Sequence, residues 1–175
     1  MRESTVQPTN RERFFPEEEI IVSKTDLKGR ITYANRTFLD VALYTEEEVL
    51  GKPHNIIRHP DMPRCVFKLL WDTLEMRKEI FAYVKNMAKN GDFYWVFAHV
   101  TPTFDAAGNV IGYHSNRRLP ERKQVELFGD IYRQLLAEEQ RHAEWRTGME
   151  AAGKMLEKMV SAQGMAYEEF IFSVQ

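Results

Sequence analysis

The chain has 175 residues, of which 43% are hydrophobic and 29% are charged, and its formal net charge is −2. This length is enough to bury one core, and the charge gives no general attraction to nucleic acid or anionic lipid. The single cysteine, Cys65, excludes an intrachain disulfide and a multi-thiolate zinc site and fits a cytoplasmic location. No secretory leader and no run of about 18 apolar residues is present, so we expect no direct insertion into a membrane.

The first part of the sequence predicts an arm, a pair of strands and a short helix. Residues 1–17 are polar and contain two prolines, which indicates a poorly ordered arm. Two short strands are expected at 19–23 and 30–34, because a turn with aspartate and glycine separates two runs of β-branched residues. Asn35 then stands where a helix cap is expected.

More helices precede three further strands. Thr45 and Glu48 have the spacing of a capping box, and Pro63 stands at the start of an amphipathic helix. The apolar face of that helix comprises Val66, Phe67, Leu70, Trp71 and Leu74. Residues 79–119 are rich in aromatic and β-branched residues and are divided by two Asn/Gly turns, which predicts three antiparallel strands. This order of elements predicts an α+β fold.

The C-terminal part is predicted to be helical. From Glu121 onward proline is absent, and apolar residues recur at near-heptad spacing. Polar residues and glycines interrupt this apolar stripe, so we expect two helical pieces rather than one rod. The stripe either covers the exposed face of the sheet or forms a dimer or partner interface.

The segment HNIIRHPDMP, residues 54–63, gathers two histidines, an arginine and an aspartate among prolines and aliphatic residues. Together with TDLKGRITYAN, the helix that contains Trp71, and VKNMAKNGDFYWV followed by NVIGYHSNRR, it resembles a PAS domain. The resemblance is strongest to the flavin-binding PAS domain of bacterial aerotaxis receptors and covers about residues 19–118.

The resemblance implies a PAS fold, with a five-stranded antiparallel sheet and short helices on one side, here followed by a C-terminal helical extension. It divides the chain into an N-terminal arm at 1–17, a PAS sensor domain at 18–119 and a helical signalling or interaction segment at 120–175.

The resemblance also implies FAD, with its ring buried between the sheet and the short helices. The residues that fall on the flavin-binding pattern are Asn35, His54, Arg58, His59, Asp61, Trp71, Asn86 and Tyr94. A flavin ring needs aromatic walls and a few fixed donors, and its pyrophosphate needs a cation such as Arg58. Asn86, on a strand, is placed to meet the pyrimidine edge, because an amide both donates and accepts.

Several of these residues also have a purely structural interpretation. Arg58 and Asp61 would form an ion pair across the proline turn, and Trp71 would belong to the core. Tyr94 and Trp95 alternate along a strand, so only one of them faces the ligand and the other is expected beneath the C-terminal helix.

Two features depart from the aerotaxis receptors. Phe81 stands where those receptors often carry tryptophan, so we expect the flavin to bind more weakly or to tilt. The chain stops at Gln175 without a transmembrane segment, a HAMP unit or a signalling hairpin. This resembles a bipartite arrangement, in which a PAS-only protein acts with a separate membrane-bound chemotaxis transducer, whereas a fragment of a longer receptor is the alternative.

The expected function is therefore redox or oxygen sensing in energy taxis. A change in the redox state of the flavin would alter the hydrogen bonds of Asn86. The resulting signal would pass through the strand at 113–119 to the helices after Glu121. We expect a homodimer through the helical segments and a cytoplasmic location, with membrane association through the partner.

Other interpretations remain open. A haem sensor would use His54 or His59 as the axial ligand, although both could be satisfied loop histidines. A cofactor-free interaction module would be colourless and have a filled core. A light-driven flavin–cysteine adduct at Cys65 is disfavoured, because the residues that surround the reactive cysteine of photosensing PAS domains are missing.

Catalysis and nucleic-acid binding have no support in the sequence. No nucleophile elbow, P-loop or HExxH spacing is present, so we expect no enzyme and no metal site. The basic stretch RRLPERK is expected to be a solvated connection rather than a reader of phosphates.

Overall fold

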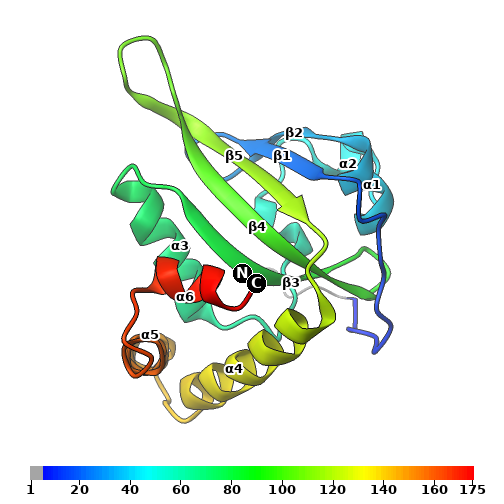
Figure 1. The fold of residues 1–175 in the computed structure, drawn as a ribbon. Coiled ribbons are helices and arrows are strands. Elements are labelled where there is room, and N and C mark those ends of the chain that lie inside the picture. Colours follow the sequence, from blue (N-terminus) through cyan, green and yellow to red (C-terminus); the bar gives the residue numbers. More distant parts are fainter. Residues whose placement is uncertain (1–5) are drawn as a thin grey trace.

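The computed structural model describes residues 6–175. Within these residues, five strands form one antiparallel sheet in the order β2-β1-β5-β4-β3. The strands are β1 (Ile21–Thr25), β2 (Ile31–Ala34), β3 (Ile80–Met87), β4 (Phe93–Phe104) and β5 (Val110–Arg118). The helices are α1 (Arg36–Ala42), α2 (Glu46–Val49), the 3₁₀ helix η1 (His54–Ile57), α3 (Arg64–Glu75), α4 (Arg122–Gln140), α5 (Trp145–Ser161) and α6 (Tyr167–Ser173). The predicted α+β fold, with its five-stranded antiparallel sheet and C-terminal helices, is confirmed (Figure 1).

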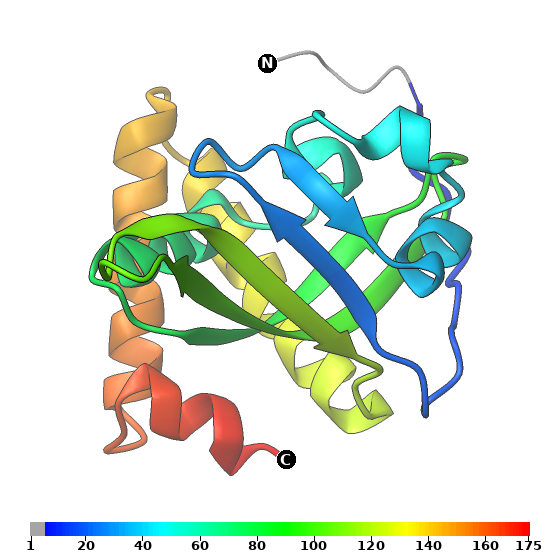
Figure 2. The ribbon, with the colours of Figure 1, turned by 90° about the horizontal axis from the view of Figure 1, so that it is seen from above.

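The short helices begin where the local sequence signals place them. The side chain of Asn35 accepts a hydrogen bond from the amide of Phe38 and so caps α1. Thr45 and Glu48 form the predicted capping box of α2. These helices lie at the β1–β2 end of the sheet, beside the hairpin that precedes them (Figure 2). Together with α3 they leave one side of the sheet facing a cavity.

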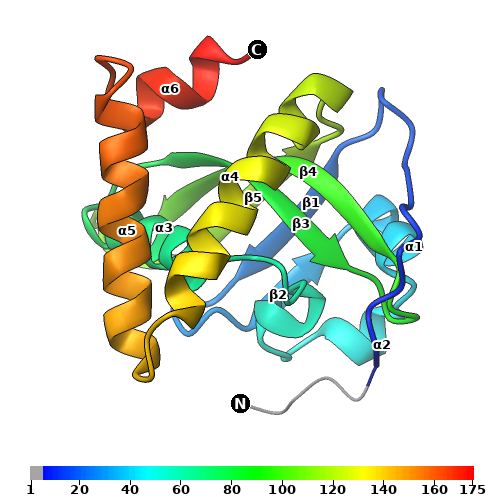
Figure 3. The same ribbon diagram turned by 90° about the horizontal axis from the view of Figure 1, so that it is seen from below.

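The C-terminal helices cover the other face of the sheet. Helix α4 crosses the sheet, as Figure 3 shows. Its Tyr132 donates a hydrogen bond of 2.6 Å to the carbonyl of Tyr83 and stacks on Trp95 at 6.1 Å. Helix α6 adds a hydrogen bond of 2.9 Å from Tyr167 to the carbonyl of Phe81. Of the two roles left open for the apolar stripe, covering the sheet is confirmed for α4. The segment contains three helices instead of the expected two.

Helix α5 lies beside α4 and also packs against α3. It therefore connects the C-terminal segment to a helix of the opposite layer. No helix within residues 6–175 is both long enough and apolar enough to cross a bilayer.

The N-terminal arm was expected to be poorly ordered, but its described residues make regular backbone contacts with the sheet. Residues 9–13 pair with the β3–β4 turn and the start of β4. The part of the prediction that concerns residues 1–5 lies outside the described residues. The amide of Thr9 donates to the carbonyl of Gly91 at 2.8 Å, and that of Arg13 donates to Phe93 at 2.7 Å. These backbone hydrogen bonds order a polar segment that its composition alone predicts to be poorly ordered.

Candidate functional site

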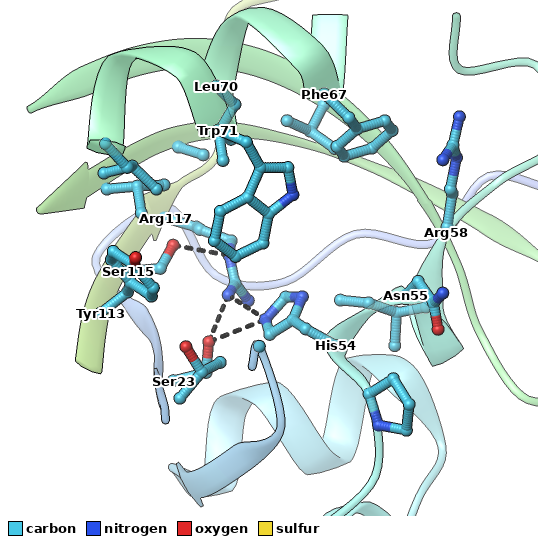
Figure 4. A pocket seen from close by; sticks show the side chains of 18 of the residues that line it. Ser23, His54, Asn55, Arg58, Phe67, Leu70, Trp71, Tyr113, Ser115 and Arg117 are labelled. Carbon is cyan, nitrogen blue, oxygen red and sulfur yellow. Dashed lines mark hydrogen bonds between the residues drawn. The ribbon is translucent and has the colours of Figure 1, made fainter. Parts of the chain in front are cut away.

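A cavity of about 420 Å³ lies between α3, η1 and the inner face of the sheet. This volume falls in the range of roughly 300–1,000 Å³ that is typical of small-molecule sites. Phe67, Leu70 and Trp71 of α3 form an apolar wall, because helical spacing puts them on one side of the helix (Figure 4). The opposite end is polar and centres on Arg117 of β5.

Arg117 is buried in this polar end, with 3% of its surface exposed. Its Nε donates to Ser115 Oγ at 3.1 Å, and its Nη2 donates to Ser23 Oγ and to His54 Nε2, the latter at 2.8 Å. Its Nη1 is buried and has no hydrogen-bond partner among residues 6–175. Strand periodicity explains the grouping, since Tyr113, Ser115 and Arg117 alternate onto the same face of β5.

The charge of Arg117 has no counter-charge of its own. Within the described part of the chain, no carboxylate forms an ion pair with it, and burial lowers its pKa to about 10. It stays protonated at neutral pH, and a buried cation with an unused donor is costly unless a partner arrives. The cavity therefore suits a ligand that presents acceptor oxygens, ring nitrogens or negative charge at this end.

His54 is held as a neutral imidazole beside that cation. Burial, and then the charge of Arg117, lower the pKa of His54 to about 3. Because Arg117 carries only donors, Nε2 of His54 accepts, and the proton of the ring belongs on Nδ1. Ser23 Oγ lies 3.0 Å from the same nitrogen and completes a polar triad.

Four of the eight predicted site residues line the cavity, namely His54, Arg58, Trp71 and Asn86. Trp71 is 38% exposed and meets Tyr113 edge to face at 5.3 Å, so it is a partly open wall rather than core. Arg58 lies over the ring of Phe67 at 4.3 Å, at the edge of the cavity. Asn86 is buried and forms a backbone bridge with Arg58, which links the predicted motif to β3.

The other four predicted residues do not line the cavity, and two of them serve the backbone. Asn35 accepts from the amides of Val22 and Phe38 and donates to the carbonyl of Ile20 at 2.7 Å. All three of these contacts go to the backbone, which supports the structural alternative of a helix cap. His59 is buried, and its Nδ1 accepts from the amide of Asp61 at 3.1 Å.

Asp61 and Tyr94 also do not line the cavity. Asp61 is paired with Lys85 at 2.6 Å, so the structural alternative of an ion pair with Arg58 is wrong. Tyr94 is fully buried, and Trp95 lies under α4 against Tyr132, as the alternation along the strand predicted. A cofactor contact for Asn35, His59 and Asp61 finds no support in this geometry, whereas Tyr94 lies opposite Asn86 in the sheet and interacts electrostatically with Arg117.

Sequence reasoning missed Arg117, Ser115 and Ser23. Arg117 belongs to the basic stretch that was expected to be solvated, and for this residue the expectation is wrong. The signal was the alternation in GYHSNRR, since every second residue of a strand points the same way. A central position for that strand, between β1 and β4, then buries the side chain.

The expectation for Phe81 is also wrong in its geometry. Phe81 lies on the outer face of the sheet, where it stacks on His99 at 4.1 Å and meets Phe172 of α6. It does not line the cavity, so its smaller ring gives no reason for weak or tilted ligand binding.

Cys65 is likewise outside the cavity. It is buried on the side of α3 that faces α5, and burial followed by the Glu139 carboxylate raises its pKa to about 12. The thiol is protonated and lies on the side of α3 away from the cavity, so it is not in position to form an adduct with a ligand bound there.

Comparison with known proteins agrees with this architecture. Residues 31–117 match the family model described as the PAS fold. The aerotaxis receptor of Escherichia coli is 40% identical over 121 residues, which are 69% of this chain and 24% of the receptor. A nitrogen fixation regulatory protein of Klebsiella pneumoniae is 27% identical over 57% of this chain and 20% of its own length. The chain thus spans about a quarter or less of these relatives.

Among solved structures, the dark structure of the blue-light photoreceptor Aureochrome1 LOV superimposes with a TM-score of 0.56. The match covers 63% of this chain and 82% of that one at 22% identity, which supports the fold alone. With the sheet order, the cavity and the family match in agreement, the chain belongs to the PAS fold family through residues 31–117.

Proposed function

We propose that this PAS protein binds FAD in the cavity and reports the redox state of the flavin as an energy-taxis sensor. The observation that carries the proposal is the buried Arg117, whose Nη1 has no partner among the described residues. A flavin ring edge offers carbonyl oxygens and nitrogens to such a donor, and a bound flavin would supply reversible uptake of electrons, which adds negative charge to the ring. Similarity to an aerotaxis receptor supports the sensory role.

The residues of the cavity divide into three groups that suit the parts of FAD. Phe67, Leu70 and Trp71 would pack against the flat ring. Arg117 and Asn86 would meet its polar edge, with His54 held neutral to keep Arg117 in place. Arg58 and Lys28, both in the cavity lining, are the cations available to the phosphates.

Redox sensing would act through the charge next to Arg117. Arg117 would shift from its hydrogen bonds to Ser23 and His54 toward added negative charge in the cavity, because a bond between two charged groups is stronger than one from a cation to a neutral acceptor. Ser23 lies on β1 and Arg117 near the end of β5, which continues directly into α4. A change in these hydrogen bonds would therefore occur close to the start of α4, the first of the C-terminal helices.

We further propose a sensor without catalytic turnover, in which residues 18–119 form the sensing unit and residues 120–175 the output. The output would reach a membrane-bound chemotaxis transducer from the cytoplasm, and homodimerisation would use the helical segment. The support is the likeness to one part of a receptor whose other parts this chain does not span.

Two alternatives have less support. A haem ligated by His54 would have to displace Arg117 and Ser23 from Nε2, and His59 does not line the cavity. A cofactor-free module was expected to have a filled core, whereas a cavity with an unpaired cation is present.

The deciding experiment is the absorption spectrum of the purified protein before and after dithionite, with the cofactor identified after heat release. A two-banded flavin spectrum that bleaches, with FAD released, is the expected result. A Soret band, or a colourless protein that takes up no added FAD, would contradict the proposal.

A further inference from the structure

Glu139, near the C-terminal end of α4, is a buried carboxylate that the site described above does not use. It is 5% exposed, and its Oε1 accepts a hydrogen bond of 2.9 Å from the backbone amide of Cys65. Its Oε2 is also buried and has no hydrogen-bond partner among residues 6–175. A buried carboxylate with one satisfied oxygen needs a further source of stabilisation.

The start of α3 supplies that stabilisation. Cys65 is the second residue of α3, and Pro63 at the helix cap offers no side-chain acceptor. The first amides of a helix are free donors at the positive end of its dipole, so a carboxylate there is favourable. Glu139 therefore caps α3 from a distance of 74 residues along the chain.

Charge near the cavity adds to this contact. Burial lowers the pKa of Arg58, Arg64 lowers it further, and Glu139 partly opposes both, so Glu139 and Arg58 interact electrostatically. Arg58 also lies at the edge of the cavity, against Phe67. Arg58 thus belongs to the cavity lining and also interacts electrostatically with the carboxylate of α4.

Helix α5 prevents Glu139 from moving independently. At Gly148 of α5 an added Cβ would lie 3.1 Å from the Cα and carbonyl carbon of Glu139 and closer still to its carbonyl oxygen. Only glycine permits this approach of the two backbones. Glu139 is consequently fixed to α5 as well as to α4.

We propose that Glu139 is a positioning residue that joins the cavity wall to the C-terminal helices, so that α3 and the α4–α5 pair respond together to the occupant of the cavity. The wall in question is the face of α3 that carries Phe67, Leu70 and Trp71. Coupling of this kind is reciprocal. The factor by which a bound ligand strengthens the docking of α4 is also the factor by which docked α4 raises the affinity for the ligand. The coupling to a cofactor rests on the proposed FAD site.

The test uses the full chain with and without added FAD, and follows amide hydrogen exchange at Cys65 and Val66 and along α4. In wild type, FAD is expected to slow exchange in both places. Glu139→Ala removes the cap, so exchange at the start of α3 rises roughly threefold to thirtyfold, and the FAD-dependent protection of α4 falls to less than half. Glu139→Gln keeps the acceptor and the shape without the charge, and decides the question if the alanine variant does not fold.

Glu138→Ala is the matched control, because Glu138 is the preceding residue of α4 and pairs only with Arg141 and His142 in the described chain. A merely structural cap would lower stability but leave the FAD dependence of α4 intact, and that result in the Glu139 variants would overturn the proposal. Should wild type take up no FAD, the proposed function fails separately. Glu139 is then judged by exchange at the start of α3 and along α4 in the unliganded chain: a rise confined to α3, or rates equal to those of Glu138→Ala, would overturn its positioning role.

Discussion

The guanidinium of Arg117 donates to Nε2 of His54 at 2.8 Å, which places a buried cation against a neutral imidazole at one end of the cavity. These residues come from β5 and η1, 63 positions apart. Neither can neutralise the other, so their arrangement keeps positive charge available inside the domain. A buried positive potential favours the more negative state of any redox ligand bound there.

Replacing Arg117 with methionine is expected to weaken FAD binding and to lower the reduction potential of any flavin that still binds. A hydrogen bond from a charged group contributes about 1.5–3 kcal/mol, which corresponds to roughly a 10- to 150-fold change in Kd. FAD titration and a spectroscopic redox titration measure the two effects. Arg118→Met changes the exposed neighbour and is expected to leave both unchanged. Equal affinity and potential in the Arg117 variant would remove Arg117 from the site.

The low pKa of His54 predicts a specific dependence of stability on pH. Its folded-state pKa of about 3 lies below its usual 6.5, so the unfolded chain binds this proton first as the pH falls. The contribution of the neutral ring is complete above the usual pKa and is lost progressively as the pH drops toward the folded-state value. His54→Gln, which has no such proton, should lose less stability than wild type between pH 7 and pH 4.

Thermal melts across that pH range provide the measurement. His142→Gln is the control, since its ring pairs with Glu138 on the surface of α4. His59, whose pKa is also lowered, to about 4, contributes in the same direction and is present in every variant compared. Parallel pH curves for wild type and His54→Gln would show that His54 is not held neutral.

Asn35 separates a structural role from a cofactor role. Its side chain makes three hydrogen bonds to backbone, at Ile20, Val22 and Phe38, and does not line the cavity. Asn35→Ala is therefore expected to lower the free energy of unfolding by about 1–3 kcal/mol while the flavin spectrum and FAD affinity per folded molecule stay the same.

Urea unfolding and FAD titration check this pair of outcomes. Arg36→Ala, in the next position and with a side chain that is 92% exposed, is the control for the helix end. A stable Asn35→Ala protein that binds FAD more weakly would restore Asn35 to the cofactor site.

The arm can be tested at Gly91. Its φ of +92° disfavours any side chain, and a Cβ there would lie 3.3 Å from the carbonyl carbon of Gln7, with the carbonyl oxygen still closer. Gly91→Ala is expected to detach the arm and to cost about 1–3 kcal/mol. Gly51→Ala isolates the backbone effect, because Gly51 also has a positive φ of +72° but has nothing within 4 Å of an added Cβ.

Limited proteolysis of the arm, read with the stability of both variants, provides the measurement. Faster cleavage within residues 6–17 is expected for Gly91→Ala only. Equal cleavage rates in the two glycine variants would mean that the contact with Gln7 does not hold the arm.

The sequence by itself determined what depends on neighbours along the chain. The cap at Asn35, the capping box of Thr45 and Glu48 and the alternation of Tyr94 and Trp95 follow from local rules of backbone hydrogen bonding and side-chain direction, and each appears in the structure. The order of these elements predicted the α+β fold, and the resemblance to PAS domains predicted the cavity and four of its lining residues.

Tertiary structure alone decided which polar residues meet. Arg117, Ser23 and His54 come from β5, β1 and η1, and only the pairing of β1 with β5 makes them neighbours. The same holds for Asp61 with Lys85, and for Glu139 with the amide of Cys65. The physical reason is that strand order and helix docking, which arise from packing over the whole chain, determine whether a charged side chain reaches solvent, a counter-charge or a cavity.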